Sequence, residues 1–265
     1  TSGTVTVNKT VGTTVTLATA MSYNNTGQDL TITAGTLNLA GFNLTVNDVF
    51  TLSASGTLRL QGGETVSTID TVSSGSTVTY DGTGSYTTAL AAGNTYSNLT
   101  FNGTGGVWEP NGAVTVSGTL TLTAGTFDLD GQNLTNTGGS FVNNATLRLT
   151  GGETLTGFTN DTDSGTVVYD GTASYTSLAA GNSYNAITLN GTGGSWIHTA
   201  TLDVNGTLTI TAGTLNSNGQ NVTLAGDWTN SGTYTSGSNT GTFDGSGAQT
   251  LTTGEIDRLL AAPSG

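Results

Sequence analysis

The residues that could carry chemistry in this chain are carboxylates that recur in matched phrases. Asp81, Asp170 and Asp244 each stand before a glycine in similar sequence surroundings. Catalysis by paired acids needs two or three carboxylates within several Å, with a base or a bound ion. In a stack of β-coils these acids are separated by about four coils, or about 19 Å at strand spacing. We therefore expect that they cannot share a substrate atom.

Two local pairs of acids are candidates for a weak Ca²⁺ site, because carboxylate oxygens are the ligands that Ca²⁺ prefers. Alternation along a strand places Asp128 and Asp130 on one face, and Asp161 and Asp163 form a second pair. The first pair is not a shared code, since the other repeats carry Asn38 with Ala40, and Asn216 with Asn218. The simpler expectation is solvated turn and surface acids, with no metal and no cofactor.

A hydrolytic enzyme is not expected. The single histidine, His198, falls in a stretch that we interpret as a surface loop. The chain has no Ser-His-Asp order, no nucleotide-binding loop and no zinc spacing.

Two further constellations recur. Arg59 with Glu64, and Arg148 with Glu153, predict an ion pair across a Gly-Gly turn, which contributes about 0–1 kcal/mol if exposed. Trp108 and Trp196 follow the same phrase, NGTGG, and exposed rings could stack on sugars or cover a coil corner. Tyr96, Tyr184 and Trp228 belong to the same set of aromatic candidates.

The elements that must position these residues are short β-strands in a long internal repeat. The phrase LTITAGTLN at residues 30–38 returns as LTLTAGTFD at 120–128 and as LTITAGTLN at 208–216. Inside each repeat, alternating segments follow one another with glycine breaks and no helical interlude. Three short strands in about 20 residues is typical of one coil of a β-solenoid.

We therefore predict an all-β fold, a right-handed parallel β-helix with about 20 residues per coil. One solenoid domain is expected over 1–254, with repeats at about 30–119, 120–207 and 208–254, followed by a C-terminal tail or cap at 255–265. Some Asp-Gly and Asn-Gly pairs suit two-residue hairpin turns, so an antiparallel β-sandwich array stays open as the alternative. Among them are Asp81-Gly82, Asn102-Gly103, Asp170-Gly171, Asn190-Gly191 and Asp244-Gly245.

Composition and charge exclude several classes of protein. Threonine is the most frequent residue, 41 residues are glycine, and only 8% are charged, with a net charge of −13. Four basic residues leave no footprint for nucleic acid, and no apolar run is long enough to span a bilayer. The chain has no cysteine, and it begins without methionine or a signal peptide. We expect a mature, exported protein at the cell surface or outside the cell.

The repeat style resembles that of filamentous-haemagglutinin and autotransporter-type surface adhesins. The phrases that carry the resemblance are LTITAGTLN, GQNLT at 131–135 and VTLAGDWTNSGT at 222–233, and it extends over about residues 29–253. It implies a parallel β-helix, export, and a structural or adhesive role, and no catalytic motif comes with it. The chain is short for such adhesins, and their N-terminal capping and secretion segment is not visible.

The ends carry the functional hypothesis, because a solenoid presents unpaired strand edges unless polar caps cover them. Thr4, Val5 and Val7 lie in a segment that alternates like a strand from the start, and Ile256, Leu259 and Leu260 have helical spacing. We expect these residues to mediate head-to-tail stacking of copies into a surface filament. The alternatives are an adhesin stalk segment and a carbohydrate-binding surface module. The expected partner is a second copy, with surface glycans next, and with no nucleic acid and no membrane insertion.

Overall fold

A computed structural model describes residues 3–256 of the chain, and it is all-β in that range. Backbone contacts divide the chain into two compact units. Unit 1 consists of residues 1–128, 132–142 and 156–158, and unit 2 of residues 129–131, 143–155 and 159–265. Each unit is a parallel β-solenoid whose coils are about 20 residues apart.

In most coils one longer strand bends and forms two sides, and a short strand forms the third side. The strands of unit 1 are β1 (Val5–Asn8), β2 (Thr14–Thr16), β3 (Met21–Tyr23), β4 (Leu30–Asn38), β5 (Leu44–Val46), β6 (Phe50–Leu60), β7 (Thr71–Val72), β8 (Thr77–Tyr80), β9 (Ser85–Tyr86), β10 (Thr95–Tyr96), β11 (Asn98–Trp108), β12 (Val114–Val116), β13 (Leu120–Asp128) and β14 (Leu134–Asn136).

The strands of unit 2 repeat this order. They are β16 (Thr146–Leu149), β18 (Thr166–Tyr169), β19 (Ser174–Tyr175), β20 (Ser183–Tyr184), β21 (Ala186–Ile197), β22 (Leu202–Val204), β23 (Leu208–Asn216), β24 (Val222–Leu224), β25 (Trp228–Thr235), β26 (Gly241–Phe243) and β27 (Leu251–Ile256). Two more strands fall where the units divide, β15 (Phe141–Asn143) and β17 (Leu155–Thr156).

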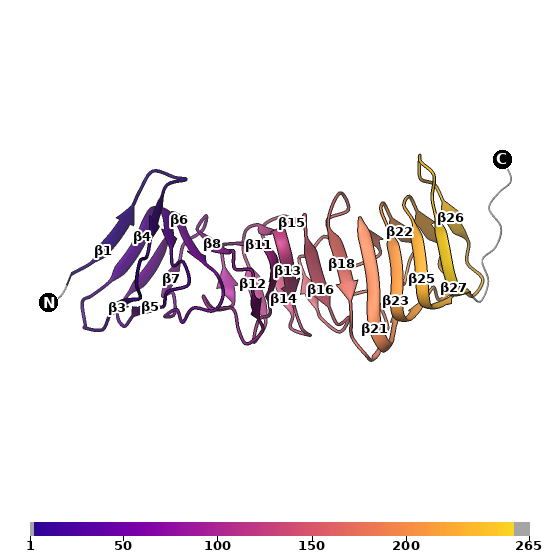
Figure 1. The fold of residues 1–265 in the computed structure, drawn as a ribbon, viewed down its shortest axis with the longest axis horizontal. Coiled ribbons are helices and arrows are strands. Elements are labelled where there is room, and N and C mark those ends of the chain that lie inside the picture. The colour runs from indigo at the N-terminus through magenta and orange to yellow at the C-terminus, as the bar shows by residue number, and fades with distance from the viewer. Residues whose placement is uncertain (1–2, 257–265) are drawn as a thin grey trace. The chain divides into compact units, whose positions relative to one another are not determined.

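Within the described residues every strand pair is parallel, and the partners are consecutive coils. In unit 2, β21 pairs with β23, β23 with β25 and β25 with β27, and Figure 1 shows these strands side by side. The alternative of an antiparallel sandwich is therefore wrong. The Asn-Gly pairs make no hairpins, since Asn102-Gly103 lies inside β11 and Asn190-Gly191 inside β21.

The alternation of apolar residues and threonine in the sequence places the apolar side chains inside the coil and the threonines on its surface. In β4 the burial alternates so that Leu30, Ile32 and Leu37 are fully enclosed, while the threonines between them are partly exposed. Each aliphatic side chain then stacks on its counterpart in the next coil, as Leu30 does on Phe50 and Leu37 on Leu58. Burial of these apolar side chains is the main favourable term that closes the coil.

The long sequence repeat and the ladder of coils are out of register. Leu120 is the sequence counterpart of Leu30, but the pairing runs from Leu120 through Leu99, Val78 and Leu58 to Leu37. Leu37 lies near the end of β4, whereas Leu30 lies at its start. Equivalent residues of successive long repeats therefore occupy different positions around the coil, one strand segment apart. They do not stack above one another.

The third side of the coil is interrupted inside unit 1. β3 pairs with β5, and Leu44 of β5 pairs with Val66 through a single bridge. β10, in the next coil, pairs only with β12, on its far side. The phrase LAAGN at residues 90–94 leads into β10, and the same phrase recurs at 178–182 in unit 2.

Close backbone contact between coils requires glycine at defined positions. A Cβ atom built on Gly103 would lie 1.9 Å from the carbonyl oxygen of Gly82 in the coil below. The two backbones meet there with no room for any side chain.

We predict that Gly103→Ala destabilises the chain by about 3 kcal/mol, because the new methyl group must push two paired coils apart. Urea denaturation followed by circular dichroism would measure the loss. Gly3→Ala is the matched control, since a Cβ atom at Gly3 meets nothing within 4 Å. Equal stability of the two variants would contradict the tight contact.

Candidate functional site

The first candidate site is the free edge of the N-terminal coil. β1 pairs with β4 in the register Val5–Leu30 and Val7–Ile32, and β2 pairs with β4 through Thr14–Thr36. The N–H group of Val5 donates to the carbonyl of Asp29 at 2.8 Å. Because bonding alternates along a parallel strand, the N–H and C=O of Thr6 point the other way. In the described residues no strand pairs with this outer edge.

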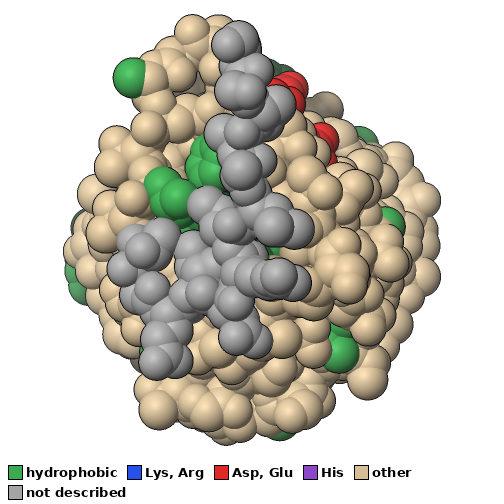
Figure 2. Space-filling model, turned by 90° about the vertical axis from the view of Figure 1, so that its right-hand side faces the viewer, with side chains coloured by type: hydrophobic (Ala, Val, Ile, Leu, Met, Phe, Trp, Pro, Cys, Tyr) green, Lys and Arg blue, Asp and Glu red, His purple; other side chains and the backbone are tan. Residues whose placement is uncertain are grey.

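The second candidate site is the edge formed by β26 and β27. β27 pairs with β25 through Trp228–Leu251 and Tyr234–Ile256, and β26 pairs with β24. The N–H of Trp228 donates to the carbonyl of Thr250 at 3.0 Å, so the backbone groups of Leu251 and Thr253 face outward. Within residues 3–256 no strand covers the outer edge of either β26 or β27. Figure 2 views this side, and its described surface is mostly neither hydrophobic nor charged.

The predicted end residues have different environments. Val5 is 40% exposed, whereas Val7 points into the core, and the hydroxyl of Thr4 donates to Asp29 at 3.3 Å. Of the segment expected as a C-terminal tail or cap at 255–265, Glu255 and Ile256 belong to the strand β27. Leu259 and Leu260 lie outside the described residues.

The two tryptophans proposed as sugar contacts are buried, so the premise of exposed rings is wrong. Trp108 and Trp196 are both 0% exposed. The Nε1 of Trp108 donates to the carbonyl of Gln61 at 2.8 Å, and that of Trp196 to Thr150 at 2.9 Å. Each indole closes a coil corner under a stacked tyrosine, Tyr86 over Trp108 and Tyr175 over Trp196. The other aromatic candidates, Tyr96, Tyr184 and Trp228, are also buried.

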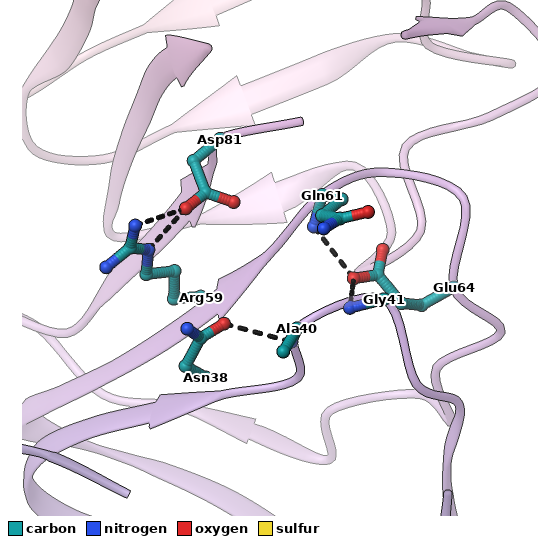
Figure 3. A network of polar contacts seen from close by, with 7 residues as sticks. All are labelled: Asn38, Ala40, Gly41, Arg59, Gln61, Glu64 and Asp81. Atoms are coloured by element: carbon teal, nitrogen blue, oxygen red, sulfur yellow. Dashed lines mark hydrogen bonds and ion pairs between the residues drawn. The ribbon is translucent and has the colours of Figure 1, made fainter. Parts of the chain in front are cut away.

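The predicted ion pair of Arg59 with Glu64 is wrong as well. Figure 3 shows that Arg59 reaches Asp81 in the next coil and not Glu64, and in unit 2 Arg148 lies 3.8 Å from Asp170. Partial burial raises the pKa of the Asp170 carboxyl, against the lowering effect of Arg148. Asp81 and Asp170 are thus partners of the arginines and not isolated turn acids.

Glu64 instead acts as a backbone cap. Its Oε1 accepts the N–H groups of Gly41 at 3.0 Å and Gln61 at 2.8 Å (Figure 3). Its Oε2 accepts the N–H of Gly62 at 2.7 Å. Glu153 repeats the arrangement with Gly131, Thr150 and Gly151. One buried carboxylate therefore satisfies three N–H groups that the turn leaves without a strand partner.

The remaining acids and the histidine also have structural surroundings. Asp128 is buried, while Asp130 is an exposed turn residue with a φ of 44°, so they do not share one face as predicted. Asp161 accepts the N–H of Asn143 at 2.8 Å and that of Asp163 at 2.9 Å. Residues 3–256 contain no group of three or more His, Asp or Glu side chains that could hold a metal ion.

The interpretation of His198 as a surface loop residue is wrong. Its side chain is enclosed, its Nδ1 lies 2.9 Å from the carbonyl of Ala200, and its Nε2 is buried without a partner. Burial lowers the pKa of this imidazole.

Each unit also contains a pair of hydrogen-bonded tyrosines, which the residue types alone did not predict. The hydroxyls of Tyr80 and Tyr96 lie 3.1 Å apart, and Tyr80 accepts the N–H of Ala92. Tyr169 and Tyr184 form the same pair at 2.9 Å in unit 2, where Tyr169 accepts the N–H of Ala180. The pairs anchor the LAAGN segments, and the repetition of that phrase is the sequence signal that points to them.

No protein-family model, curated protein or solved structure matches this chain. Among the described residues no helix is long and apolar enough to cross a membrane. The function must therefore be argued from the geometry of the edges and of the third side of the coil.

We predict that Glu64→Ala lowers the free energy of unfolding by about 3 kcal/mol, because it leaves one buried and two partly buried N–H groups without an acceptor. Glu64→Gln should cost about half as much, since it keeps one acceptor oxygen. Thermal and urea denaturation would measure both, with the exposed neighbour Thr65→Ala as the control. A loss no larger than that of Thr65→Ala would contradict the capping role.

The tyrosine pairs predict a loss of stability at alkaline pH. Burial raises the pKa of Tyr80, Tyr96, Tyr169 and Tyr184 above the ordinary value of 10.0. Below about pH 10 these groups are protonated in both states, and above it only the unfolded chain releases their protons. Stability should fall above pH 10 by about 1.4 kcal/mol per pH unit for each such tyrosine.

Tyrosinate absorbance, recorded beside urea unfolding from pH 8 to 11.5, checks this expectation. The four phenols should ionise only as the chain unfolds. Ionisation of every tyrosine in a chain that remains folded at pH 11 would show that the pairs are open to solvent.

Proposed function

We propose that this chain is an extracellular structural protein, the subunit of a surface filament in which copies stack head to tail by β-pairing. The observation that carries the proposal is the complementarity of the two free edges. Export and the likeness in repeat style to haemagglutinin and autotransporter-type surface proteins rest on the sequence. The polar, sparsely charged composition supports the same reading.

The two edges match in backbone hydrogen-bonding pattern. On β27 the N–H and C=O of Leu251 and Thr253 point outward, and on β1 those of Thr6 do. A register that places Thr6 between Leu251 and Thr253 makes the same parallel ladder that Thr31 makes between Val5 and Val7. The β1 edge of one copy therefore has the donors and acceptors that the β27 edge of another lacks.

The side chains match in the same register. Val5 falls over Leu251 and Thr6 over Thr252, which repeats the aliphatic-over-aliphatic and Thr-over-Thr stacking of Val5 on Leu30 and Thr6 on Thr31. β1, β2 and β3 contain no charged residue, so no like charges oppose the contact from that side. Contacts of this kind do not close on themselves, and they propagate into a filament.

The two alternatives, a carbohydrate-binding module and an adhesin stalk segment, have different support. A carbohydrate-binding module loses its proposed contacts, since Trp108 and Trp196 lie in the core. An adhesin stalk segment keeps its basis in the repeat style, and the ends then pair with further coils of one long chain. Electron microscopy of the purified protein at rising concentration separates the two, because only a subunit forms fibres from isolated copies.

We predict that Thr6→Pro abolishes fibres and leaves the fold of the subunit intact. Proline at position 6 removes an N–H of β1 that points away from β4, and edge strands tolerate proline at such a position. Thr6→Val, which keeps the N–H, is the matched control. Sedimentation velocity and microscopy should show monomers for the first variant and fibres for the second.

Fibres formed equally by Thr6→Pro and by Thr6→Val would show that the β1 edge does not make the contact. Absence of fibres for the unchanged chain at high concentration and near-native salt would overturn the filament itself. Denaturation midpoints of the three proteins serve as the check that each is folded.

A further inference from the structure

The interruption on the third side of unit 1 forms a groove of about 610 Å³ between two consecutive coils. One wall is the segment from Val66 to Val72 and the other is the LAAGN segment with Thr95. Apolar groups line much of it, namely Val66, Ile69, Val72, Leu90, Ala91 and Ala92. The carboxyl-bearing residue Asp70 is the one charged residue among the lining residues that the structure describes.

Both walls present backbone groups that have no strand partner. The C=O of Thr65 and the N–H of Ser67 bond to Leu44 below, so those of Val66 face the groove. The C=O groups of Asn94 and Tyr96 accept from Thr115 and Ser117 above. The N–H and C=O of Thr95 therefore face the groove from the other side. One rung of the backbone ladder is missing at this place.

A second observation points to a ligand. The Oδ1 of Asn94, which lines the groove, is buried and has no hydrogen-bond partner, while its Nδ2 donates to Asn111 at 3.0 Å. An unsatisfied buried carbonyl oxygen costs free energy that a donor entering the groove would recover.

The corresponding place in unit 2 is closed. Asn160 donates from its Nδ2 to the carbonyl of Ser183, the counterpart of Thr95, at 2.9 Å. The Oδ1 of Asn182, the counterpart of Asn94, accepts the N–H of Thr199 at 3.2 Å. In unit 1 the residue aligned with Asn160 is Thr71, which pairs with Thr51 in β7 and carries no amide. The two sites thus differ in whether a side-chain amide reaches the far wall, although the Oδ1 of Asn160 is, like that of Asn94, buried without a partner.

We propose that the open groove binds an extended peptide as an inserted β-strand, and that the occupant is the segment Arg258–Ala262 of a second copy. A strand there pairs with Val66 on one wall and Thr95 on the other, as in recognition by β-strand addition. This contact is separate from the end-to-end pairing of β1 with β27.

The sequence of the tail fits the groove in charge and polarity. Of the four basic residues, Arg59 and Arg148 are engaged with Asp81 and Asp170 in the stack. Arg258 is the cation that the tail carries, and it complements Asp70. Leu259, Leu260, Ala261 and Ala262 supply apolar side chains for the lining, and Pro263, which has no N–H, ends the strand.

The chain has no cysteine, so introduced thiols give a direct test. The full-length Ala91→Cys variant is mixed, in a glutathione redox buffer, with a fluorescent peptide of residues 256–265 that carries Ala261→Cys. Full-length Ala179→Cys, at the counterpart position in the filled site, is the matched control. We expect disulfide capture of the peptide to be at least tenfold faster at position 91 than at position 179.

Two further variants make the result specific. Thr71→Asn gives the open groove the amide that fills the unit 2 site, and it should reduce capture at position 91 to the rate at position 179. A peptide with Arg258→Glu should be captured several-fold more slowly, because its charge now opposes that of Asp70. Circular dichroism confirms that each acceptor protein is folded.

Equal capture rates at positions 91 and 179, or capture unaffected by Thr71→Asn, would overturn the inserted strand. Fibres of the unchanged chain are scored without peptide and depend on Thr6. The failure of this inference and the failure of the filament proposal are therefore separate results.

Discussion

The parallel backbone ladder between consecutive coils is the constraint on which the rest of this protein depends. Each coil must meet the next at about 4.8 Å along its whole paired length, so every residue type is selected for what stands about 20 residues before and after it. Gly103 shows the limit of this selection, because its Cα lies against the carbonyl of Gly82 with no space for a methyl group. Thr31 over Thr51 and Leu30 over Phe50 show the ordinary case, in which like environments stack.

At the corners of the coil the backbone ladder is interrupted, and polar side chains supply the missing hydrogen bonds. At one corner of unit 1 the carboxylate of Glu64 replaces strand partners for Gly41, Gln61 and Gly62. Asp70 does the same for the N–H of Phe50 at 2.8 Å. Such caps explain why a chain with few charges still buries some of them, since a backbone donor left without an acceptor costs more than a desolvated carboxylate with three donors. Among the acids considered as catalytic or calcium-binding candidates, Asp161 accepts two backbone N–H groups, while Asp81 and Asp170 pair with arginines.

The fold could be predicted from sequence because alternation is a local signal, while the sites could not because they depend on which coils are neighbours. The segment LTITAGTLN predicts the strand Leu30–Asn38 directly. By contrast, Arg59 finds Asp81 and not Glu64 because its side chain reaches the next coil. Trp108 is buried because the corner at Gln61 lies beneath it. The advance of the repeat by one strand segment, visible in the pairing of Leu120 with the ladder of Leu37, has no signature in the phrases themselves.

The edges and the groove are two forms of the same physical feature, a ladder rung without a partner. An unpaired edge of a β-sheet binds another strand readily, and natural proteins cover such edges or make them unattractive. In unit 2 the chain covers its gap with Asn160, which reaches the carbonyl of Ser183. In unit 1 the aligned Thr71 is already paired with Thr51, and the side-chain Oδ1 of Asn94 has no donor. Two sites built from one repeated phrase thus differ in whether a side-chain amide reaches the carbonyl group on the far wall, and that difference is the reason to regard the open one as a place for another strand.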